Sequence, residues 1–285
     1  MVDRTPIGVL GLGNMGMPIA RRLVAAGHQV IGWDRADREL DGGTIVRSAA
    51  EVTGRCATVL YLLPELEMIR PLLADGLLDD AATRTLIVMS TCSPVAITDL
   101  AASLADRGIR LIDAPMSGGV TGAEQGRLSI MVGADQADFD AVAPLLAVLG
   151  TTVRLLGPVG AGSVAKACNQ LVVSATLCAL AEATLIAERN GLDRELMLDM
   201  LAGGLAASEV LTQKRHALAN DDFRPTGPAK FLVKDLRFAE EAGGSLDLPV
   251  RSAVAGLFNA LTDAGLGDQD NAVVLQHLRD TQPPA

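Results

Sequence analysis

Residues 7–34 read IGVLGLGNMGMPIARRLVAAGHQVIGWD, and this stretch decides the fold of the first part of the chain. A short apolar strand, Ile7 to Leu10, runs into the turn Gly11-Leu12-Gly13-Asn14-Met15-Gly16, which opens a helix. In such a turn the first glycine permits the tight bend, the second lets backbone N–H groups approach a pyrophosphate, and the third lets the helix pack on its strand. The order of strand, turn and helix predicts a dinucleotide-binding unit with these six turn residues at the cofactor.

An acidic residue closes the second strand of this unit. That strand follows Gly27-His28 and ends at Asp34, 18 residues beyond Gly16, where a carboxylate would meet the ribose hydroxyls of a dinucleotide. A carboxylate repels a 2′-phosphate, so Asp34 favours NAD, whereas Arg35 beside it keeps NADP possible. We expect NAD as the cofactor, with NADP as the alternative.

The composition of the 285 residues restricts the class of protein. Apolar residues make up 49% and charged residues 20%, which indicates a globular chain, and the net charge of −10 argues against a nucleic-acid partner. The most apolar run, 171–181, is too short to span a membrane, and Asp3 and Arg4 before the first strand leave no room for a targeting peptide. We expect a cytoplasmic protein without a membrane partner. Its cysteines are then reduced thiols, namely Cys56, Cys92, Cys168 and Cys178.

The pattern of the chain changes near residue 160. Before it, short apolar strands alternate with helices, which is typical of a parallel sheet covered by helices on both faces. After Gly157-Pro158-Val159-Gly160, residues 161–190 form one long helix, and only helices follow. We expect a dinucleotide-binding domain over residues 1–160 and an all-helical domain over residues 161–285. The later strands are expected at 57–63, 85–89, 109–114, 128–132 and 152–156, and the later helices at 194–202, 208–219, 229–243, 249–264 and 270–279.

A lysine on the long helix is the candidate acid/base. Lys166, Asn169 and Gln170 fall on one face of that helix because they are three and four residues apart. The helix is otherwise rich in Ala, Val and Leu, and an apolar setting lowers the pKa of a lysine and lets it exchange protons near neutral pH. The alternative is a lysine that extends its ammonium group to solvent beside two solvated amides. No His–Asp pair or metal cluster is evident in the sequence around the three histidines, which disfavours a histidine or zinc mechanism.

Two polar segments follow expected strands. Ser117-Gly118-Gly119 offers a hydroxyl and two unobstructed backbone N–H groups for a small carboxylate, although an ordinary glycine-rich turn has the same composition. In Ser90-Thr91-Cys92-Ser93-Pro94 the hydroxyls are suited to a nicotinamide amide, and Ser93 is suited to cap the helix that Pro94 begins. The pair Lys234-Asp235 by itself predicts a solvated surface charge pair.

Four separated motifs occur in order: GLGNMG at 11–16, DAPMSGG at 113–119, GAGSVAKACNQ at 160–170 and KDL at 234–236. Together they resemble the β-hydroxyacid dehydrogenase family, which includes 3-hydroxyisobutyrate dehydrogenases and tartronate semialdehyde reductases. The resemblance covers essentially the whole chain. It implies an α/β Rossmann-type domain followed by an all-α domain, joined through the long helix.

The resemblance also implies an activity. The chain would be an NAD(P)-dependent oxidoreductase that interconverts a small 3-hydroxy acid and its semialdehyde, as a homodimer or homotetramer, with Lys166 as the catalytic acid/base. Two alternatives share the fold: an imine reductase, which usually lacks a lysine at the Lys166 position, and a non-catalytic binding protein, which tends to lose it. The implied substrate residues are Ser117, Gly118, Gly119, Asn169 and Gln170, and the implied cofactor residues beyond the turn and Asp34 are Leu63, Pro64, Thr91 and Lys234.

Overall fold

A computed structural model gives the fold and describes residues 5–79 and 81–282. Asp3 and Arg4, on which the expectation of no targeting peptide rested, lie outside the described residues. The chain divides into two compact units, a sheet unit, Met1–Lys166, and a helical unit, Ala167–Ala285. Each unit has its own apolar core. The predicted order, an α/β part followed by an all-helical part, is confirmed.

The sheet unit is built on nine strands in the order β3-β2-β1-β4-β5-β6-β8-β7, with β9 paired to β8. Their bounds are β1 Ile7–Leu10, β2 Val30–Trp33, β3 Thr44–Ile45, β4 Thr58–Tyr61, β5 Thr85–Val88, β6 Arg110–Asp113, β7 Met116–Ser117, β8 Leu128–Gly133 and β9 Gly150–Gly157. From β3 to β6 all neighbours are parallel. Every residue of β1 and β5 is buried, as expected where helices cover both faces of a parallel sheet.

The sheet is mixed, so the prediction of a parallel sheet is wrong at one edge. β8 runs antiparallel to both β6 and β7, in a single register from Asp113 opposite Gly133 to Ser117 opposite Ser129. β6 and β7 therefore form one extended run, interrupted before Met116 where Pro115 has no N–H to donate to the ladder. β8 returns beside this run after a short helix, and a neighbour that returns in this way pairs antiparallel.

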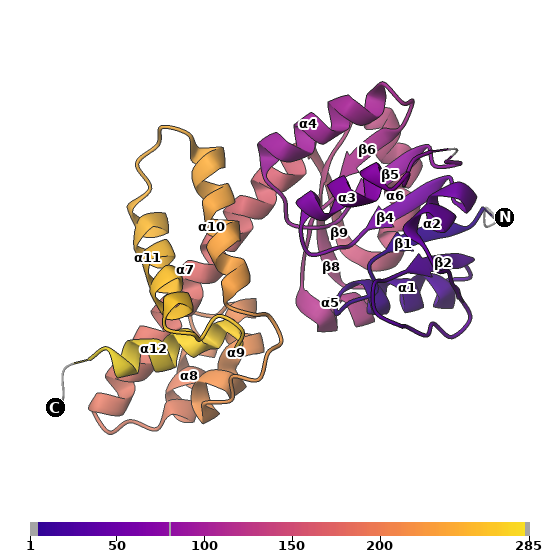
Figure 1. The fold of residues 1–285 in the computed structure, drawn as a ribbon. Coiled ribbons are helices and arrows are strands. Elements are labelled where there is room, and N and C mark those ends of the chain that lie inside the picture. The colour runs from indigo at the N-terminus through magenta and orange to yellow at the C-terminus, as the bar shows by residue number, and fades with distance from the viewer. Residues whose placement is uncertain (1–4, 80, 283–285) are drawn as a thin grey trace. The chain divides into compact units, whose positions relative to one another are not determined.

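Helices cover both faces of the sheet, as predicted (Figure 1). Their bounds are α1 Gly16–Ala25, α2 Ala49–Arg55, η1 Leu66–Met68, α3 Ile69–Ala74, α4 Pro94–Ala105, α5 Gly119–Gln125 and α6 Gln136–Leu149. One apolar cluster joins the sheet to α1, α5 and α6 through side chains such as Leu23 and Leu146. The cluster on the other face joins it to α2, α3 and α4 through side chains such as Val52 and Leu104. Full burial of each such apolar side chain stabilises the fold by about 1.5–3 kcal/mol.

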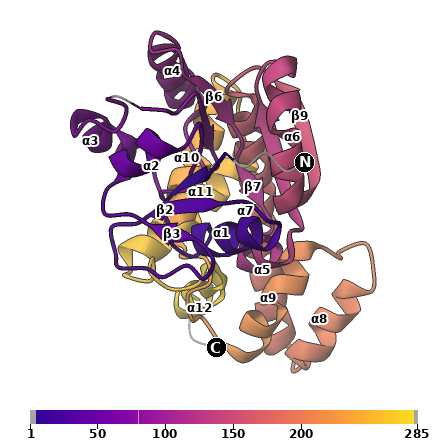
Figure 2. The ribbon, with the colours of Figure 1, turned by 90° about the vertical axis from the view of Figure 1, so that its right-hand side faces the viewer.

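Beyond β9 the described chain contains no further strand, so the predicted change to helices is confirmed. The helices are α7 Ala161–Arg189, α8 Arg194–Ala202, α9 Glu209–Asn220, α10 Lys230–Gly243, α11 Pro249–Asp263, η2 Asn271–Val273 and α12 Val274–Asp280. α10 and α11 pack side by side, as do α8 and α9 (Figures 1 and 2). The core between these helices includes Leu177, Leu236 and Phe258, each with none of its surface exposed.

The long helix α7 is apolar and partly buried. By length and composition alone its 29 residues are enough to cross a membrane, with a mean hydropathy of 1.7 over its most apolar 18 residues. The prediction from sequence considered only the run 171–181. Leu177, Cys178 and Ala181 of this helix lie in the apolar core of the helical unit.

Candidate active site

The glycine-rich turn lies between β1 and α1, as predicted. Gly11 follows β1 with a φ of +98°, and α1 begins at Gly16. A Cβ atom at Gly16 would collide with the carbonyl oxygen of Gly11, so the close packing of helix on strand requires glycine there. At Gly13, in contrast, nothing lies within 4 Å of the position that a Cβ would take. Gly16 serves the packing of the fold, while the space beside Gly13 is open to a ligand.

The other three residues of the turn differ in exposure. Leu12 is buried in the cluster that α1 shares with the sheet, and Met15 packs partly against the same cluster. Asn14 is exposed. The two apolar side chains anchor the turn, and the polar one stands at its surface.

Asp34 follows β2, and the turn holds its carboxylate. Oδ2 accepts a hydrogen bond of 2.6 Å from the backbone N–H of Leu12, and Oδ1 accepts one of 2.9 Å from Ala36. The Nε of Arg38 lies 3.7 Å from Oδ1, whereas Arg35 is exposed. A fixed carboxylate after β2, together with the open space beside Gly13 after β1, fits the ribose and pyrophosphate of a dinucleotide.

The remaining predicted cofactor residues of the sheet unit follow neighbouring strands. Leu63 and Pro64 come after β4 and Thr91 comes after β5, and β1, β4 and β5 are adjacent in the sheet. The Ser90 hydroxyl donates a 2.5 Å hydrogen bond to the carbonyl oxygen of Leu63, which ties two of these strand ends together. Ser93 caps α4 by accepting a 3.0 Å hydrogen bond from a backbone N–H of its first turn, so that prediction is confirmed.

The predicted carboxylate cradle follows β6. Ser117 ends β7 and pairs with Ser129 of β8, and α5 begins at Gly119. Ser117 and Gly118 are half-buried and Gly119 is exposed. The pairing with β8 fixes the backbone at Ser117, and the segment is partly accessible to solvent, most of all at Gly119.

Lys166 lies near the start of α7 and is buried, with 7% of its surface exposed. This burial does not fit the alternative of a lysine that extends its ammonium group to solvent. The residue belongs to the sheet unit, together with the dinucleotide turn.

A fully buried carboxylate, Asp113, holds the start of the same helix. Its Oδ2 accepts hydrogen bonds from the backbone N–H groups of Gly160 at 3.1 Å and Ser163 at 2.8 Å, and its Oδ1 accepts one from the Ser163 hydroxyl at 2.8 Å. Burial raises the pKa of Asp113, and these hydrogen bonds oppose the rise without cancelling it. Asp113 and Ser163 lie within two of the four motifs, but neither was predicted to hold the helix start. A sequence signal for Asp113 existed, because an aspartate at the end of a buried strand needs hydrogen-bond donors close by.

In the helical unit a chain of hydrogen bonds links two helices. Asn169 Nδ2 donates to Gln170 Oε1 at 3.0 Å, and Gln170 Nε2 donates to Asp235 Oδ2 on α10 at 2.6 Å. Lys234 Nζ lies 3.7 Å from Asp235 Oδ1 and 5.6 Å from the centre of the Phe238 ring. Asp235 is only 5% exposed, so the prediction of a solvated Lys234-Asp235 pair is wrong. The KDL motif supplies a buried carboxylate that fixes the amide of Gln170.

The predicted residues fall into two groups. In the sheet unit the cofactor residues and the cradle follow the carboxyl ends of β1, β2, β4, β5 and β7, where ligands bind in open α/β sheets. Asn169, Gln170 and Lys234 belong to the helical unit.

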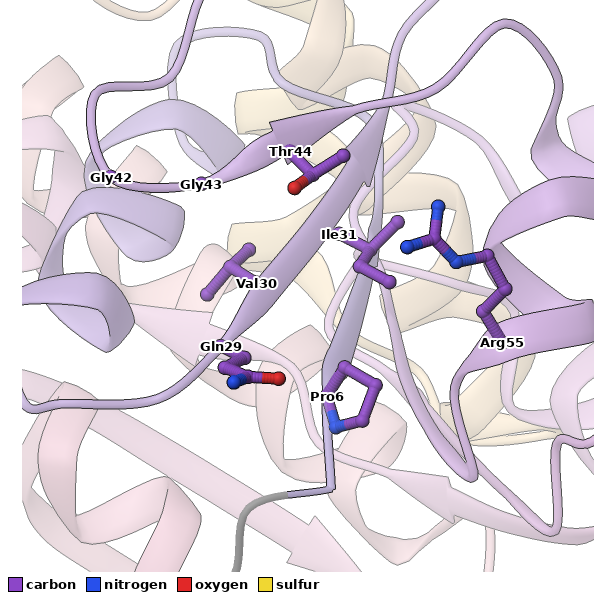
Figure 3. A pocket seen from close by; sticks show the side chains of 8 residues that line it. All are labelled: Pro6, Gln29, Val30, Ile31, Gly42, Gly43, Thr44 and Arg55. Atoms are coloured by element: carbon purple, nitrogen blue, oxygen red, sulfur yellow. The ribbon is translucent and has the colours of Figure 1, made fainter.

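A hollow of about 410 Å³ lies at the other end of the strands (Figure 3). Pro6, Gln29 and Gly43, which line it, immediately precede β1, β2 and β3. No predicted site residue lines this hollow, so it is separate from the dinucleotide turn. Within residues 5–79 and 81–282, no group of three or more His, Cys, Asp or Glu side chains is placed to hold a metal ion.

The fold and the turn define a protein with a Rossmann-type dinucleotide-binding domain. Residues 6–157 match the family model described as the NAD binding domain of 6-phosphogluconate dehydrogenase, and residues 160–278 match NAD-binding of NADP-dependent 3-hydroxyisobutyrate dehydrogenase. The chain belongs to the 3-hydroxyisobutyrate dehydrogenase, or β-hydroxyacid dehydrogenase, family, and the resemblance carried by the four motifs is confirmed.

Several relatives match this chain over nearly their full length. The 2-hydroxy-3-oxopropionate reductase of Escherichia coli is 33% identical, with 95% of this chain and 96% of the relative covered. The NAD-dependent L-serine dehydrogenase of Pseudomonas aeruginosa is 31% identical, with 97% and 98% covered. The structure of Mycobacterium tuberculosis 3-hydroxyisobutyrate dehydrogenase with L-serine is 32% identical, covers 97% of this chain and 100% of its own, and has a TM-score of 0.82. The protein is thus an NAD(P)-dependent oxidoreductase of this family.

Proposed function

We propose that the protein interconverts a small 3-hydroxy acid and its semialdehyde, with Lys166 as the acid/base. The bound nicotinamide supplies the hydride chemistry. In the oxidative direction the neutral Nζ of Lys166 takes the proton of the substrate hydroxyl, and in reduction its ammonium group protonates the forming alkoxide. The observation that carries the proposal is a buried lysine near the start of α7 in a chain of this family.

The substrate class follows from the relatives' names and from the cradle. L-serine and 2-hydroxy-3-oxopropionate share three carbons, a carboxylate and an oxygen on the third carbon. We assign the carboxylate to the Ser117 hydroxyl and the N–H groups of Gly118 and Gly119. Asn169 orients the substrate and Gln170 completes the site, and the hydrogen bond from Gln170 to Asp235 supports this assignment because it fixes both amides.

NAD is the proposed cofactor. The carboxylate of Asp34 is fixed by Leu12 and Ala36 where a 2′-phosphate would lie, and two like charges repel there. The Asp34→Asn variant should therefore bind NADPH more tightly relative to NADH than the wild type does. The proposal also assigns to the cofactor the glycine-rich turn, Arg35, Leu63, Pro64, Thr91 and Lys234.

The direct test is a screen of the purified protein at 340 nm with NAD and NADP. The panel holds 3-hydroxyisobutyrate, 3-hydroxypropionate, glycerate and L-serine, with the matching semialdehydes and two cyclic imines. Lys166→Met should lower turnover by about 10²–10⁴-fold, which is the range of general acid–base catalysis. The matched control is Lys230→Met, since Lys230 is exposed and pairs with Asp268. Equal turnover by wild type and Lys166→Met would contradict the lysine mechanism, and reduction of the imines alone would favour the imine reductase.

A pair of glycine variants tests the dinucleotide site by itself. A methyl group at Gly13 or at Gly54 of α2 meets no atom within 4 Å. Both Gly13→Ala and Gly54→Ala should therefore fold. Only Gly13→Ala should weaken NADH binding, measured by nucleotide fluorescence, because only there does the methyl group occupy the space assigned to the pyrophosphate. Equal affinities would place the cofactor elsewhere.

We further propose a homodimer or homotetramer in the cytoplasm. The helical unit leaves large apolar side chains exposed, which supports a contact with a second copy: Val172, Ile186, Leu196, Met200 and Leu205. The four cysteines are free thiols, which is in keeping with a reducing compartment. Light scattering of the wild type and of Val172→Glu tests the assembly, and a monomeric wild type would contradict it.

A further inference from the structure

We propose that Asp113 is the positioning residue of the proton-transfer group: its carboxylate sets the start of α7, and with it Lys166, against the strand that carries the substrate cradle. The inference rests on the proposed role of Lys166. It assigns a function to the first residue of the DAPMSGG motif, which touches neither the substrate nor the cofactor in the proposed site.

The first step is the contact itself. The first N–H groups of any helix have no partner within the helix, and a carboxylate there is stabilised by hydrogen bonds and by the helix dipole. At α7 the carboxylate comes from a distant strand, 50 residues away from Ser163 in sequence. Its bonds to Gly160 and Ser163 span the first turn of the helix. A single side chain thus fixes both the position and the direction of the helix start.

The second step is the absence of free space around that turn. A Cβ atom at Gly162 would collide with the carbonyl oxygen of Met131 and would lie 2.7 Å from that of Asp113. On the sheet side, a Cβ at Gly133 would lie 2.9 Å from the backbone nitrogen of Gly162. The helix start therefore lies directly against β6 and β8. Loss of the carboxylate would remove the hydrogen bonds that hold the helix start in place. Because the contacts with β6 and β8 are so close, even a small shift of the helix start would produce steric clashes.

The third step connects both ends of this contact to the proposed chemistry. Ser163 and Lys166 are three residues apart on α7, a rise of about 4.5 Å. Asp113 and Ser117 are four residues apart on the β6–β7 run, which pairs with β8 in one register. The carboxylate of Asp113 is a polar link between these two short segments. Reacting groups tolerate little misplacement, since a shift of about 1 Å can lower a rate about 10²-fold.

The test uses Asp113→Asn, which keeps the shape but loses the carboxylate charge and one acceptor oxygen, and the milder Ser163→Ala. The matched control is Asp193→Asn, because Asp193 caps α8 in the helical unit by accepting a 2.8 Å hydrogen bond from Leu196. Turnover is measured with the member of the 3-hydroxy acid panel that the wild type oxidises fastest, and is normalised to active sites counted by NADH binding.

We expect kcat per NADH site to fall about 10–100-fold in Asp113→Asn and about threefold to tenfold in Ser163→Ala, with NADH affinity unchanged. With substrate deuterated at the carbon that loses its hydride, the isotope effect on kcat should rise in Asp113→Asn. A misplaced lysine slows the chemical step and makes it more rate-limiting. A role confined to stability would lower the number of NADH sites and leave kcat per site and the isotope effect as they are. That result would overturn the proposal.

A labelling experiment keeps the test independent of turnover. The chain has four lysines: Lys166, Lys214, Lys230 and Lys234. Brief acetylation followed by mass spectrometry reports the reactivity of Lys166 relative to exposed Lys230. This ratio should change at least twofold in Asp113→Asn and stay constant in Asp193→Asn, while the reactivity of Lys214 stays constant in both. If Lys166→Met keeps full turnover but the ratio changes, the lysine mechanism fails and the link from Asp113 to Lys166 stands. If neither the ratio nor kcat changes in Asp113→Asn, the link itself is wrong.

Discussion

Asp113 in the sheet unit and Asp270 in the helical unit are both buried aspartates that hold the start of a helix, yet their partners differ. Asp113 is bonded to backbone N–H groups and to the Ser163 hydroxyl, and none of the ion pairs within the described chain includes it. Asp270 accepts hydrogen bonds of 2.8 Å at both oxygens from Lys214 Nζ, besides those from Thr226 and Ala272.

The pKa values of the two carboxyl groups move in opposite directions. Burial raises the pKa of Asp113 despite its hydrogen bonds. Burial acts on Asp270 in the same sense, but the hydrogen bonds from Lys214 and Thr226 outweigh it and lower its pKa. A full positive charge beside a buried carboxyl group thus lowers its pKa below the ordinary value, whereas neutral donors alone do not. Asp270 is paired with a cation, so its carboxylate should stabilise the fold. Within the described residues Asp113 has only neutral donors, and its clear contribution is to hold the start of α7.

The largest expected effect is the loss of Asp270. Asp270→Ala would leave the ammonium group of Lys214, whose side chain is 15% exposed, without its carboxylate. Removal of one partner of a buried ion pair costs about 3–5 kcal/mol. Asp113→Ala leaves only neutral donors and should cost about 1–3 kcal/mol. Urea unfolding followed by circular dichroism measures both. A larger loss in Asp113→Ala would reverse the comparison.

The pH dependence of stability should separate the two sites by sign. A lowered pKa in the folded state means that the contribution of Asp270 is complete above the unfolded value of about 4 and is lost as the pH falls through the folded pKa. A raised pKa means that Asp113 binds its proton more tightly in the folded state, so its contribution falls as the pH rises from about 4 to the folded pKa.

The gap in unfolding free energy between wild type and Asp270→Asn should therefore widen as the pH rises from acid toward about 4, the unfolded value. The gap for Asp113→Asn should narrow as the pH rises above about 4, the unfolded value. Urea titrations at several pH values give both gaps. If both gaps changed in the same direction with pH, the pKa values of the two carboxyl groups would be shifted in the same direction, and the comparison would fail.

The sequence predicted the elements of the fold better than their pairing. Strand 7–10 and helix 194–202 agree to the residue with β1 and α8, because a strand without polar residues and a helix with Asp193 as its cap carry strong local signals. The antiparallel edge was not predicted. A buried strand such as β8 has the same apolar composition in either direction, and the two-residue β7 carries no periodicity.

The candidate site divides in the same way. Residues placed by local motifs, such as Gly16 and Asp34, lie where the pattern put them, because strand, turn and helix are contiguous in sequence. Asp113 and Ser163 were missed as a pair because their contact joins residues 50 positions apart. Asp235 was expected at the surface because a charged residue is usually exposed. Its partner, the Gln170 amide, comes from a different helix and cannot be found from the local sequence.

A smaller effect should follow when each carboxylate loses only its hydroxyl donor. Ser163 is 1% exposed, so Ser163→Ala leaves buried Asp113 Oδ1 without that partner and should cost about 1–2 kcal/mol. Thr226 is exposed, and Lys214 stays on Asp270 in Thr226→Val, which should cost about 0.5 kcal/mol. Thermal or urea unfolding of the two variants ranks them. If Thr226→Val lowers the unfolding free energy as much as Ser163→Ala does, the Lys214 ammonium group does not compensate Asp270 for the lost hydroxyl donor.

The smallest effect is expected where a helix-capping aspartate is exposed. Asp193 caps α8 at the surface with one hydrogen bond to Leu196, and Asn caps helices about as well as Asp. Asp193→Asn should therefore change the unfolding free energy by no more than a few tenths of a kcal/mol, whereas Asp193→Ala should cost about 1 kcal/mol. The same Asp→Asn change at Asp113 should cost more, because the buried site has no water to replace a lost acceptor. If the two Asp→Asn changes cost the same, burial would not be the reason that Asp113 differs from an ordinary cap.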